Sequence, residues 1–555
     1  MFKIALELAC VASVGGHAAG ADVFPDQIDR LFARFQKPDS PGCALAVVRD
    51  GQVVYENGYG MANLDDAAPI TPSTVFHIAS VSKQFTSFAI ALLAAEGKLS
   101  LDDDVRRYVP EVPDFGARIT LRHLLNHTSG LRDQWSLLVL AGWRMEDVIT
   151  EADVLDLVHH QRELNFPPGE RFLYSNTGYT LLAMVVQRVS GRSLRTFAEA
   201  EMFEPLMMTS THFHDDHRMI VKQRARSYAP KGDHAFEEVV LSYATVGATS
   251  LFTTVGDLAL WQQNFAEHTV GSAALMAAML EPGKLNDGTT LSYAAGLELG
   301  SYRGLKTIGH GGGDAGFRAY LVRFPDQDFA IALLGNAGHL DAQGLAYRVA
   351  DLYLADAFTE PPAAPEAAAA DPTAGTAAAL EPLAGLYLNR KTGELWQADV
   401  VAGALTLRGA GASHRLTALG PNRFSAKRGD GRLEVEFLAA AAGQRPDHIR
   451  LRLPGSPQDH LERVQPAPSG TDHFWQYTGE YRSDELDSSY RVSVNQGKLV
   501  LSRRKYGEQP LVPIYQDAFQ SDGFAWEFTR DAQGHVNGGL ANTGRVVNLR
   551  FHRLP

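Results

Sequence analysis

The segment HIASVSKQFTSFAIALLAAEGKLS, residues 77–100, decides the fold prediction, and the rest of the chain is interpreted around it. Ser80 and Lys83 are three residues apart, so a helix that begins near Ser80 places the hydroxyl and the amine on one face. From Phe85 to Ala95 the residues are nearly all apolar, which predicts a helix buried on every side that Gly97 ends. Because burial lowers the pKa of a lysine, Lys83 is predicted to activate Ser80 as a nucleophile.

The S-x-x-K pattern is weak evidence by itself, because Ser502-Arg503-Arg504-Lys505 matches it too. That copy follows the strand-like run KLVLS and carries two arginines, so it is predicted to be a solvated strand end. For Ser80 the alternative is a helix-capping serine followed by a surface lysine.

Length, charge and composition narrow the function classes. A chain of 555 residues is expected to form about three domains. The formal charge of −13 argues against a basic surface that would bind nucleic acid. The sequence also has no polybasic run of the kind that binds an anionic membrane surface. The sequence therefore indicates a globular protein that binds neither.

The N-terminus predicts export. Residues 1–21 read as a basic start, an apolar run and an Ala19-Gly20-Ala21 cleavage site, which is typical of a signal peptide and of a periplasmic or secreted protein. Glu7 argues against a lipid anchor at Cys10, and no later segment is apolar enough to span a bilayer. Without the leader, Cys43 is left alone in the run CALAVV, where it is expected to be a buried apolar side chain.

The first domain is predicted to combine one antiparallel sheet with flanking helices. A hairpin turns at Asp50-Gly51, and a second hairpin joins residues 317–324 to 329–336. Strands at both ends with helices between them favour an α+β domain whose sheet uses both ends and carries a helical insertion. Helices are expected near residues 26–36, 118–130, 151–160, 178–189, 254–265 and 344–356.

Composition changes abruptly after this domain. Residues 359–380 are rich in Ala and Pro without periodicity, which predicts a linker between a hydrolase domain at 22–358 and the rest. The C-terminal part looks duplicated, because Gly385 and Gly479 are separated by the same number of residues as Gly403 and Gly497, and Phe424 and Phe519 by one more. We expect two tandem all-β units, at 381–465 and 472–555.

Two further motifs could complete a site around Ser80. Tyr174-Ser175-Asn176 precedes an apolar helix, so its phenol could exchange protons with Lys83 and its amide could hold a substrate carbonyl. The glycine-rich run around His310, Gly311, Gly312 and Gly313 could let a substrate approach a strand backbone, whose N–H groups could bind an oxyanion. The alternative for this run is a flexible turn with a solvated histidine.

Other chemistries find little support. The chain has no G-x-S-x-G, no H-E-x-x-H and no paired C-x-x-C, so it indicates neither an α/β-hydrolase elbow nor a metal or other cofactor. The cluster of His212, His214 and His217 with Asp215 and Asp216 is interpreted as a polar surface loop. His127 is interpreted as a side chain that holds a helix end by hydrogen bonds.

The three motifs, in this order, resemble those of the penicillin-recognising serine hydrolases, in the branch of class C β-lactamases, DD-peptidases and related esterases. The runs LLNHTSGL (124–131) and PPGERFLYSN (167–176) are also similar to that family. The resemblance implies a β-lactamase-like domain in which Ser80 is acylated, with Lys83 and Tyr174 as the acid/base pair and Asn176 as a carbonyl contact. It also implies that His310 replaces the third-motif lysine and that the N–H groups of Ser80 and Gly313 form the oxyanion hole.

A narrower resemblance concerns the whole chain. Two β units after the hydrolase domain, with YTGEYRSDELDSSYRV (477–492) opening the second, are similar to the three-domain architecture of D-aminopeptidases, where two lipocalin-like barrels follow the catalytic domain and a loop of the last one reaches the site. The implied function is acyl-enzyme hydrolysis of small amides or peptides. Alternatives are a carboxylesterase, a weak β-lactamase or DD-peptidase, or a non-catalytic penicillin-binding-like sensor. The implied partner is a small amide, peptide or ester substrate.

Overall fold

The computed structural model describes residues 24–361 and 377–555, except 233, 234, 243, 410, 411, 421, 429, 430, 440–443 and 454–457. The predicted signal peptide and most of the predicted linker lie outside the described residues. In the described part no helix is long and apolar enough to cross a bilayer.

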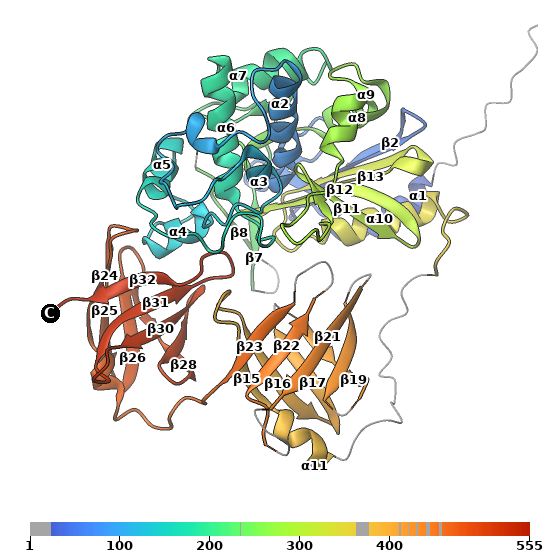
Figure 1. Ribbon diagram of the computed structural model, residues 1–555. Helices are drawn as coiled ribbons and strands as arrows, with labels where there is room; N and C mark the ends of the chain where they lie inside the picture. Colours follow the sequence, from blue (N-terminus) through green and yellow to red (C-terminus); the bar gives the residue numbers. More distant parts are fainter. Residues whose placement is uncertain are drawn as a thin grey trace, which may run out of the picture.

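A seven-stranded antiparallel sheet forms the centre of the first domain and joins segments from both of its ends (Figure 1). In the order β10-β11-β12-β13-β14-β1-β2, the first strand of the N-terminal hairpin pairs with β14, with Cys43 opposite Gly335. The predicted single sheet is thereby confirmed. Its strands are β1 (Cys43–Arg49), β2 (Gln52–Tyr59), β10 (Tyr293–Ala294), β11 (Leu297–Tyr302), β12 (Leu305–Asp314), β13 (Phe317–Phe324) and β14 (Phe329–Gly335).

Helices cover both faces of this sheet. On β1, Cys43, Leu45 and Val47 contact the layer formed by α1 and α10, whereas Ala44 and Ala46 face the larger helical layer. A strand buried on both faces is apolar throughout, which explains CALAVV and the buried Cys43. The helices are α1 (Pro25–Phe32), α2 (Lys83–Ala95), α3 (Leu121–Leu125), α4 (Gln134–Leu140), α5 (Glu151–His159), α6 (Asn176–Ser190), α7 (Leu194–Ala198), α8 (Val255–Glu267), α9 (Ala273–Met279) and α10 (Ala342–Tyr353).

Short strands complete the domain. They are β3 (Met61–Asn63), β4 (Ala68–Pro69), β5 (Phe76–His77), β6 (His212–Phe213), β7 (Tyr228–Lys231), β8 (Ala235–Glu238) and β9 (Leu251–Thr253). The predicted helix over 118–130 was too long, since only α3 is helical there and His127 adopts a φ of 56°. A positive φ at a non-glycine residue is incompatible with a continuing α-helix.

Helix α2 is buried along its first two turns. Every residue from Lys83 to Ile90 is buried, whereas Ala91 and Leu92 are half-buried. Gly97 adopts a φ of 70° just beyond the end of the helix, as predicted. The prediction of burial on every side therefore holds for the turns that carry the chemistry and not for the C-terminal end.

Two nine-stranded antiparallel sheets of the same topology follow, each curled into a nearly closed barrel (Figure 1). In each sheet the first strand pairs with the last, β15 with β23 and β24 with β32. The first contains β15 (Gly385–Leu388), β16 (Leu395–Val401), β17 (Ala404–Gly409), β18 (Ala412–Arg415), β19 (Thr417–Ala418), β20 (Arg423–Arg428), β21 (Gly431–Leu438), β22 (His448–Arg452) and β23 (Asp459–Val464). The second contains β24 (Gly479–Ser483), β25 (Ser488–Asn495), β26 (Lys498–Arg503), β27 (Gly507–Pro510), β28 (Val512–Tyr515), β29 (Ala518–Ser521), β30 (Phe524–Arg530), β31 (Val536–Asn542) and β32 (Leu549–Arg553).

Equivalent residues confirm the duplication. Tyr387 in the first barrel donates a hydrogen bond to Leu383 O at 2.8 Å, and Tyr481 in the second donates to Tyr477 O at 2.7 Å. The paired glycines Gly385 and Gly479 both lie against an arginine side chain of the last strand. Helix α11 (Ala377–Leu380) precedes the first barrel and falls within the last residues of the predicted linker.

The second barrel docks on α4 and α5 of the first domain through a buried ion pair (Figure 1). Arg132 Nη1 lies 2.5 Å from Glu485 Oε2, and both side chains are almost fully buried. Arg503 is also buried and donates to Val139 O at 2.8 Å, so the second S-x-x-K copy ends a strand at an interface and not in solvent as predicted. Breaking a buried pair leaves an uncompensated charge, so Arg132 and Glu485 fix how the two units meet.

Candidate active site

Ser80 lies in a short 3₁₀ turn, η2 (Ala79–Ser82), that leads directly into α2. Ala79 has a φ of 48°, and Ser82 Oγ donates to Ala79 O at 2.6 Å while it accepts the N–H of Leu251 at 3.1 Å. Ser80 is half-buried between the fully buried stretches 74–79 and 81–90. The turn thus presents one accessible hydroxyl on an otherwise buried segment.

Strand β12 lies directly against this turn because of Gly312. A Cβ atom at Gly312 would stand 2.3 Å from Ile78 O, which no side chain allows. At Gly311 and Gly313 the nearest atom would be 3.7 Å away, so packing does not require glycine there. The close approach predicted for a substrate is made at Gly312 by the turn that carries Ser80, and the oxyanion hole of Ser80 and Gly313 stays a prediction.

Lys83 is fully buried with three polar neighbours. Its Nζ lies 3.1 Å from Ser80 Oγ, 2.9 Å from Asn176 Oδ1 and 2.7 Å from Ala248 O. Burial holds the pKa of Lys83 well below its usual value, although the charge of Asp133 opposes that shift. Removal from water is therefore the dominant influence, and it favours the neutral amine.

The neutral amine has a defined orientation. It keeps two N–H donors, and Asn176 Oδ1 and Ala248 O can only accept, so both donors are used there. The lone pair is then left to face Ser80 Oγ, whose hydroxyl can donate to it. This arrangement is what a general base for the serine requires.

Asp133 fixes the amide of Asn176, a role that sequence reasoning missed. Its Oδ2 accepts the backbone N–H of Asn176 at 2.8 Å and the side-chain Nδ2 at 2.7 Å. A carboxylate can only accept, so the amide oxygen of Asn176 must point toward Lys83. The only local signal was that of a helix cap, since Asp133 is also the N-cap of α4 and accepts from Ser136 N at 3.2 Å.

Tyr174 lies next to Lys83 and Ser80. Its ring centre is 4.7 Å from Lys83 Nζ, and its buried hydroxyl lies near Ser80 but completes no well-formed hydrogen bond with a described residue. Burial raises the pKa of Tyr174, and Ser80 and Arg545 partly offset that rise. A buried phenol with an unused donor next to Ser80 is suited to pass a proton to a departing group.

A chain of hydrogen bonds connects the Y-x-N loop to His310. Ser175 N donates to His127 Nδ1 at 3.1 Å, so the remaining proton of a neutral His127 is on Nε2, which lies 3.1 Å from Tyr293 Oη. Tyr293 then donates to His310 Nε2, also at 3.1 Å, and His310 Nδ1 donates to Gly311 O at 2.6 Å. Burial lowers the pKa of both histidines, that of His310 to about 4, which agrees with neutral rings.

His310 is therefore occupied on both ring nitrogens, and only 3% of the residue is exposed. The structure brings it close to Tyr174, with ring centres 6.1 Å apart, but it reaches a substrate with neither nitrogen in this arrangement. Its predicted contact with substrate stays a prediction. His127, interpreted from the sequence as holding a helix end, does so, because it accepts the N–H of Ser175, the N-cap of α6, and its ring also lies against Tyr174, with ring centres 4.1 Å apart.

Replacing Tyr293 by Phe should lower kcat/KM about tenfold, because His127 and His310 each lose a hydrogen-bond partner while the ring is kept. Steady-state kinetics with an activated ester, with Tyr302→Phe as control, would measure this. Tyr302 bonds Asp351 at the far end of β11. A Tyr293→Phe rate within twofold of wild type would contradict a positioning role for the chain.

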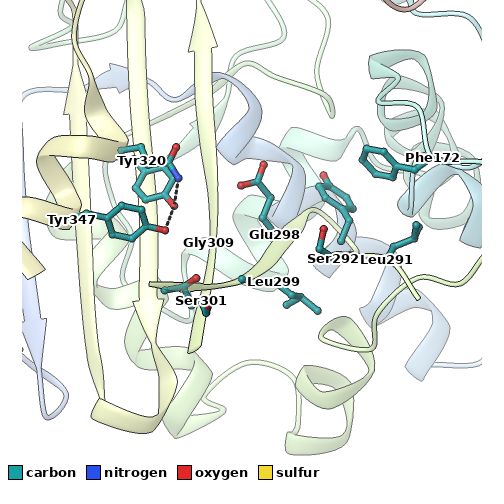
Figure 2. Close-up of a pocket in the computed structure, with 13 residues that line it drawn as sticks. Phe172, Leu291, Ser292, Glu298, Leu299, Ser301, Gly309, Tyr320 and Tyr347 are labelled. Atoms are coloured by element: carbon teal, nitrogen blue, oxygen red, sulfur yellow. Dashed lines mark hydrogen bonds between the residues drawn. The ribbon is translucent and has the colours of Figure 1, made fainter. Parts of the chain in front are cut away.

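A cavity of about 430 Å³ opens beside Tyr293 (Figure 2). Figure 2 shows the carboxylate of Glu298, from β11, pointing into it between Tyr320 and Phe172. The carboxylate of Glu298 makes no ion pair or hydrogen bond with any described residue, and partial burial raises its pKa. Phe172 is 38% exposed at the rim, so the cavity offers an aromatic wall and an unpaired acid.

The turn 543–548 between β31 and β32 of the second barrel closes the other side of the site. The guanidinium carbon of Arg545 lies 4.8 Å from the ring centre of Tyr174. Asp133 N donates to Arg545 O at 3.3 Å, so the turn also touches the residue that orients Asn176. The expectation from the D-aminopeptidase resemblance, that a loop of the last barrel reaches the site, is thereby confirmed, although the local sequence of this turn carries no motif for it.

The histidine cluster near residue 214 is a surface loop only in its second half, since His217 is exposed and Asp215 and Asp216 are half-buried, whereas His212 and His214 depart from the prediction. His214 is buried, and the rings of His212 and His214 both lie against Phe252. Burial lowers the pKa of His212 to about 4 and that of His214 to about 3. These side chains are part of the packing around β6 and β9.

The fold and the grouped side chains are those of a serine hydrolase. Residues 28–354 match the family model described as Beta-lactamase, and the chain belongs to that family.

Relatives support the same class. A D-aminopeptidase of Brucella ovis is 25% identical over 94% of this chain and 97% of its own, and penicillin-binding protein 4* of Bacillus subtilis is 29% identical over 54% of this chain and 69% of its own. Among solved structures, the octameric penicillin-binding protein homologue from Pyrococcus abyssi covers 79% of this chain and 98% of its own, with a TM-score of 0.53 and 24% identity. That likeness concerns the fold.

Proposed function

We propose that this enzyme hydrolyses small amides or peptides that carry a free amino group, through an acyl-enzyme on Ser80. The buried Lys83 beside Ser80 carries the proposal of a hydrolase, and Glu298, an unpaired carboxylate in the cavity next to Tyr293, is the candidate contact for the amino group, although neither Ser80, Lys83 nor Tyr174 lines that cavity. A carboxylate flanked by aromatic rings suits an ammonium ion, by charge and by cation–π attraction. The D-aminopeptidase relative supports the same substrate class, and a signal peptide would place the enzyme in the periplasm or outside the cell.

The proposed reaction follows from the positions of Ser80, Lys83 and Tyr174. Neutral Lys83 takes the proton of Ser80 as its oxygen attacks the carbonyl carbon, and the N–H groups of Ser80 and Gly313 receive the developing negative charge. Tyr174 donates a proton to the departing nitrogen and regains one from Lys83. A water molecule then attacks the ester on Ser80 by the same proton transfers in reverse.

Replacing Glu298 by Gln tests the substrate assignment. The ratio of kcat/KM for D-alanine p-nitroanilide to that for its N-acetyl analogue should fall about tenfold or more, because a charge-assisted contact to the ammonium is lost. The exposed Glu281→Gln variant is the matched control and should keep the wild-type ratio. A wild-type enzyme that cleaves both compounds equally, or an unchanged ratio in Glu298→Gln, would refute amine recognition by Glu298.

Rates on other substrates separate the remaining candidates. Short-chain esters preferred over D-aminoacyl amides would indicate a carboxylesterase, and turnover of a chromogenic cephalosporin would indicate a β-lactamase or DD-peptidase. A permanent adduct on Ser80 without product release, detected by mass spectrometry, would indicate a sensor. Lys83 and Tyr174 both lie where deacylation needs them, which favours turnover.

A further inference from the structure

Arg545 is an exposed arginine at the edge of the active site that has no acidic partner within the described residues. Its guanidinium makes one described contact, with the ring of Tyr174 at 4.8 Å. Other arginines of the same barrel pair with carboxylates, such as Arg491 with Glu480 at 2.7 Å and Arg550 with Glu163 at 3.3 Å. In a chain of net charge −13, a cation left unpaired beside Tyr174 is a candidate anion site.

The backbone around Arg545 is held in place on both sides. Thr543 Oγ1 accepts the N–H of Arg545 at 3.0 Å, and Thr543 N donates to Val546 O at 2.8 Å, which closes the turn. The side chain of Asn165, in the first domain, binds the backbone of this turn: it donates to Arg545 O at 3.0 Å and accepts from Val547 N at 2.9 Å. The side chain of Arg545 therefore starts from a fixed point over Tyr174.

The position of Arg545 indicates which part of a substrate it meets. A group that protonates the departing nitrogen must lie next to that nitrogen, and Tyr174 is the proton donor of the proposed mechanism. A guanidinium stacked on the Tyr174 ring then stands on the side of the departing group. Arg545 also opposes the protonation of Lys83, His127 and Tyr174, whose pKa values it lowers, so it acts within the electrostatic field of the site.

We propose that Arg545 binds a carboxylate on the departing part of the substrate, so that the preferred substrates are short peptides with a free carboxyl group close after the cleaved bond. This inference rests on the proposed function and names its substrate class. Arginine matches a carboxylate with two parallel N–H donors, which gives both charge and direction.

The test compares two substrates that differ only in the terminal group, D-Ala-Gly and D-Ala-Gly amide. Wild type should prefer the free acid at least tenfold in kcat/KM, and Arg545→Gln should reduce that preference about tenfold or more. Arg491→Gln removes an arginine from the same barrel away from the site and should keep the wild-type ratio. Equal losses on acid and amide in Arg545→Gln would overturn the proposal and assign Arg545 to tuning of Tyr174 alone, and so would a wild type without preference.

A second readout does not depend on peptide cleavage. N-acetylglycine and N-acetylglycinamide can be compared as inhibitors of p-nitrophenyl acetate hydrolysis, which needs only the Ser80 machinery. The acid should inhibit wild type more strongly than the amide, and the difference should vanish in Arg545→Gln. If wild type cleaves neither peptide but shows this difference, the proposed function fails and the anion site stands; if it cleaves both peptides alike and shows no difference, the reverse holds.

Discussion

Replacing Ser80 by Ala should lower kcat at least about 10⁴-fold on both an activated ester and D-alanine p-nitroanilide, since no acyl-enzyme can form. The fold should be unaffected, because Lys83 keeps its contacts with Asn176 Oδ1 and Ala248 O. The midpoint temperature of thermal unfolding should therefore change by no more than a few degrees, and mass spectrometry should find no acyl adduct on the protein.

The chain provides its own control for this experiment. Ser502 occupies the same four-residue pattern, but it lies at the end of β26 in the second barrel, at the interface with α4. Ser502→Ala should retain wild-type kinetics. Undiminished hydrolysis by Ser80→Ala, or a comparable loss in Ser502→Ala, would show that the nucleophile is elsewhere.

Replacing Asp133 by Asn should reduce kcat/KM by about 10²–10³-fold, although this side chain does not contact Ser80. Two donors of Asn176 share Oδ2 of Asp133, and a third N–H, from Ser136, uses Oδ1. An asparagine amide has only one acceptor oxygen for these three donors, and its NH₂ group then faces at least one of them without forming a hydrogen bond. Asn176 then loses the partner that keeps its oxygen on Lys83, and losing a buried contact of this kind costs about 1–3 kcal/mol for each unsatisfied group.

The pH dependence of this variant has a defined sign. The charge of Asp133 raises the pKa of Lys83, so removing it lowers that pKa further. A base acts when deprotonated, so activity rises with pH through the pKa of Lys83, and the acid limb of kcat/KM should move to lower pH in Asp133→Asn. Asp257→Asn, a buried aspartate bonded to Thr211, controls for loss of a buried charge. A limb that moves to higher pH would exclude Lys83 as the base.

The sequence was sufficient for those parts of the site that local patterns encode. Ser80 and Lys83 sit one helical turn apart, Tyr174 and Asn176 sit at a helix start, and the glycines of β12 allow a close backbone approach. Each of these depends on neighbours in the chain. The same holds for the two barrels, whose repeated glycines and tyrosines mark equivalent strands.

The remaining residues enter the site only through tertiary contacts. Asp133 resembles any helix cap, and Tyr293 and Glu298 come from short strands at the sheet edge that carry no motif. Arg545 belongs to a surface turn of a barrel, and only the docking of that barrel brings it to Tyr174. Docking depends on surface complementarity between units, which no periodicity in one unit records.

The buried pair Arg132–Glu485 has a consequence for the order in which the enzyme becomes competent. Arg132 is followed by Asp133, so the contact that holds the second barrel is adjacent in the chain to the residue that orients Asn176. During refolding, the first domain can assemble Ser80 and Lys83 from its own residues, whereas Arg545 arrives only when the barrel docks. Hydrolysis of the ester should then return earlier during refolding than discrimination between the peptide acid and the peptide amide. Reactivity and selectivity are therefore expected to recover at different rates.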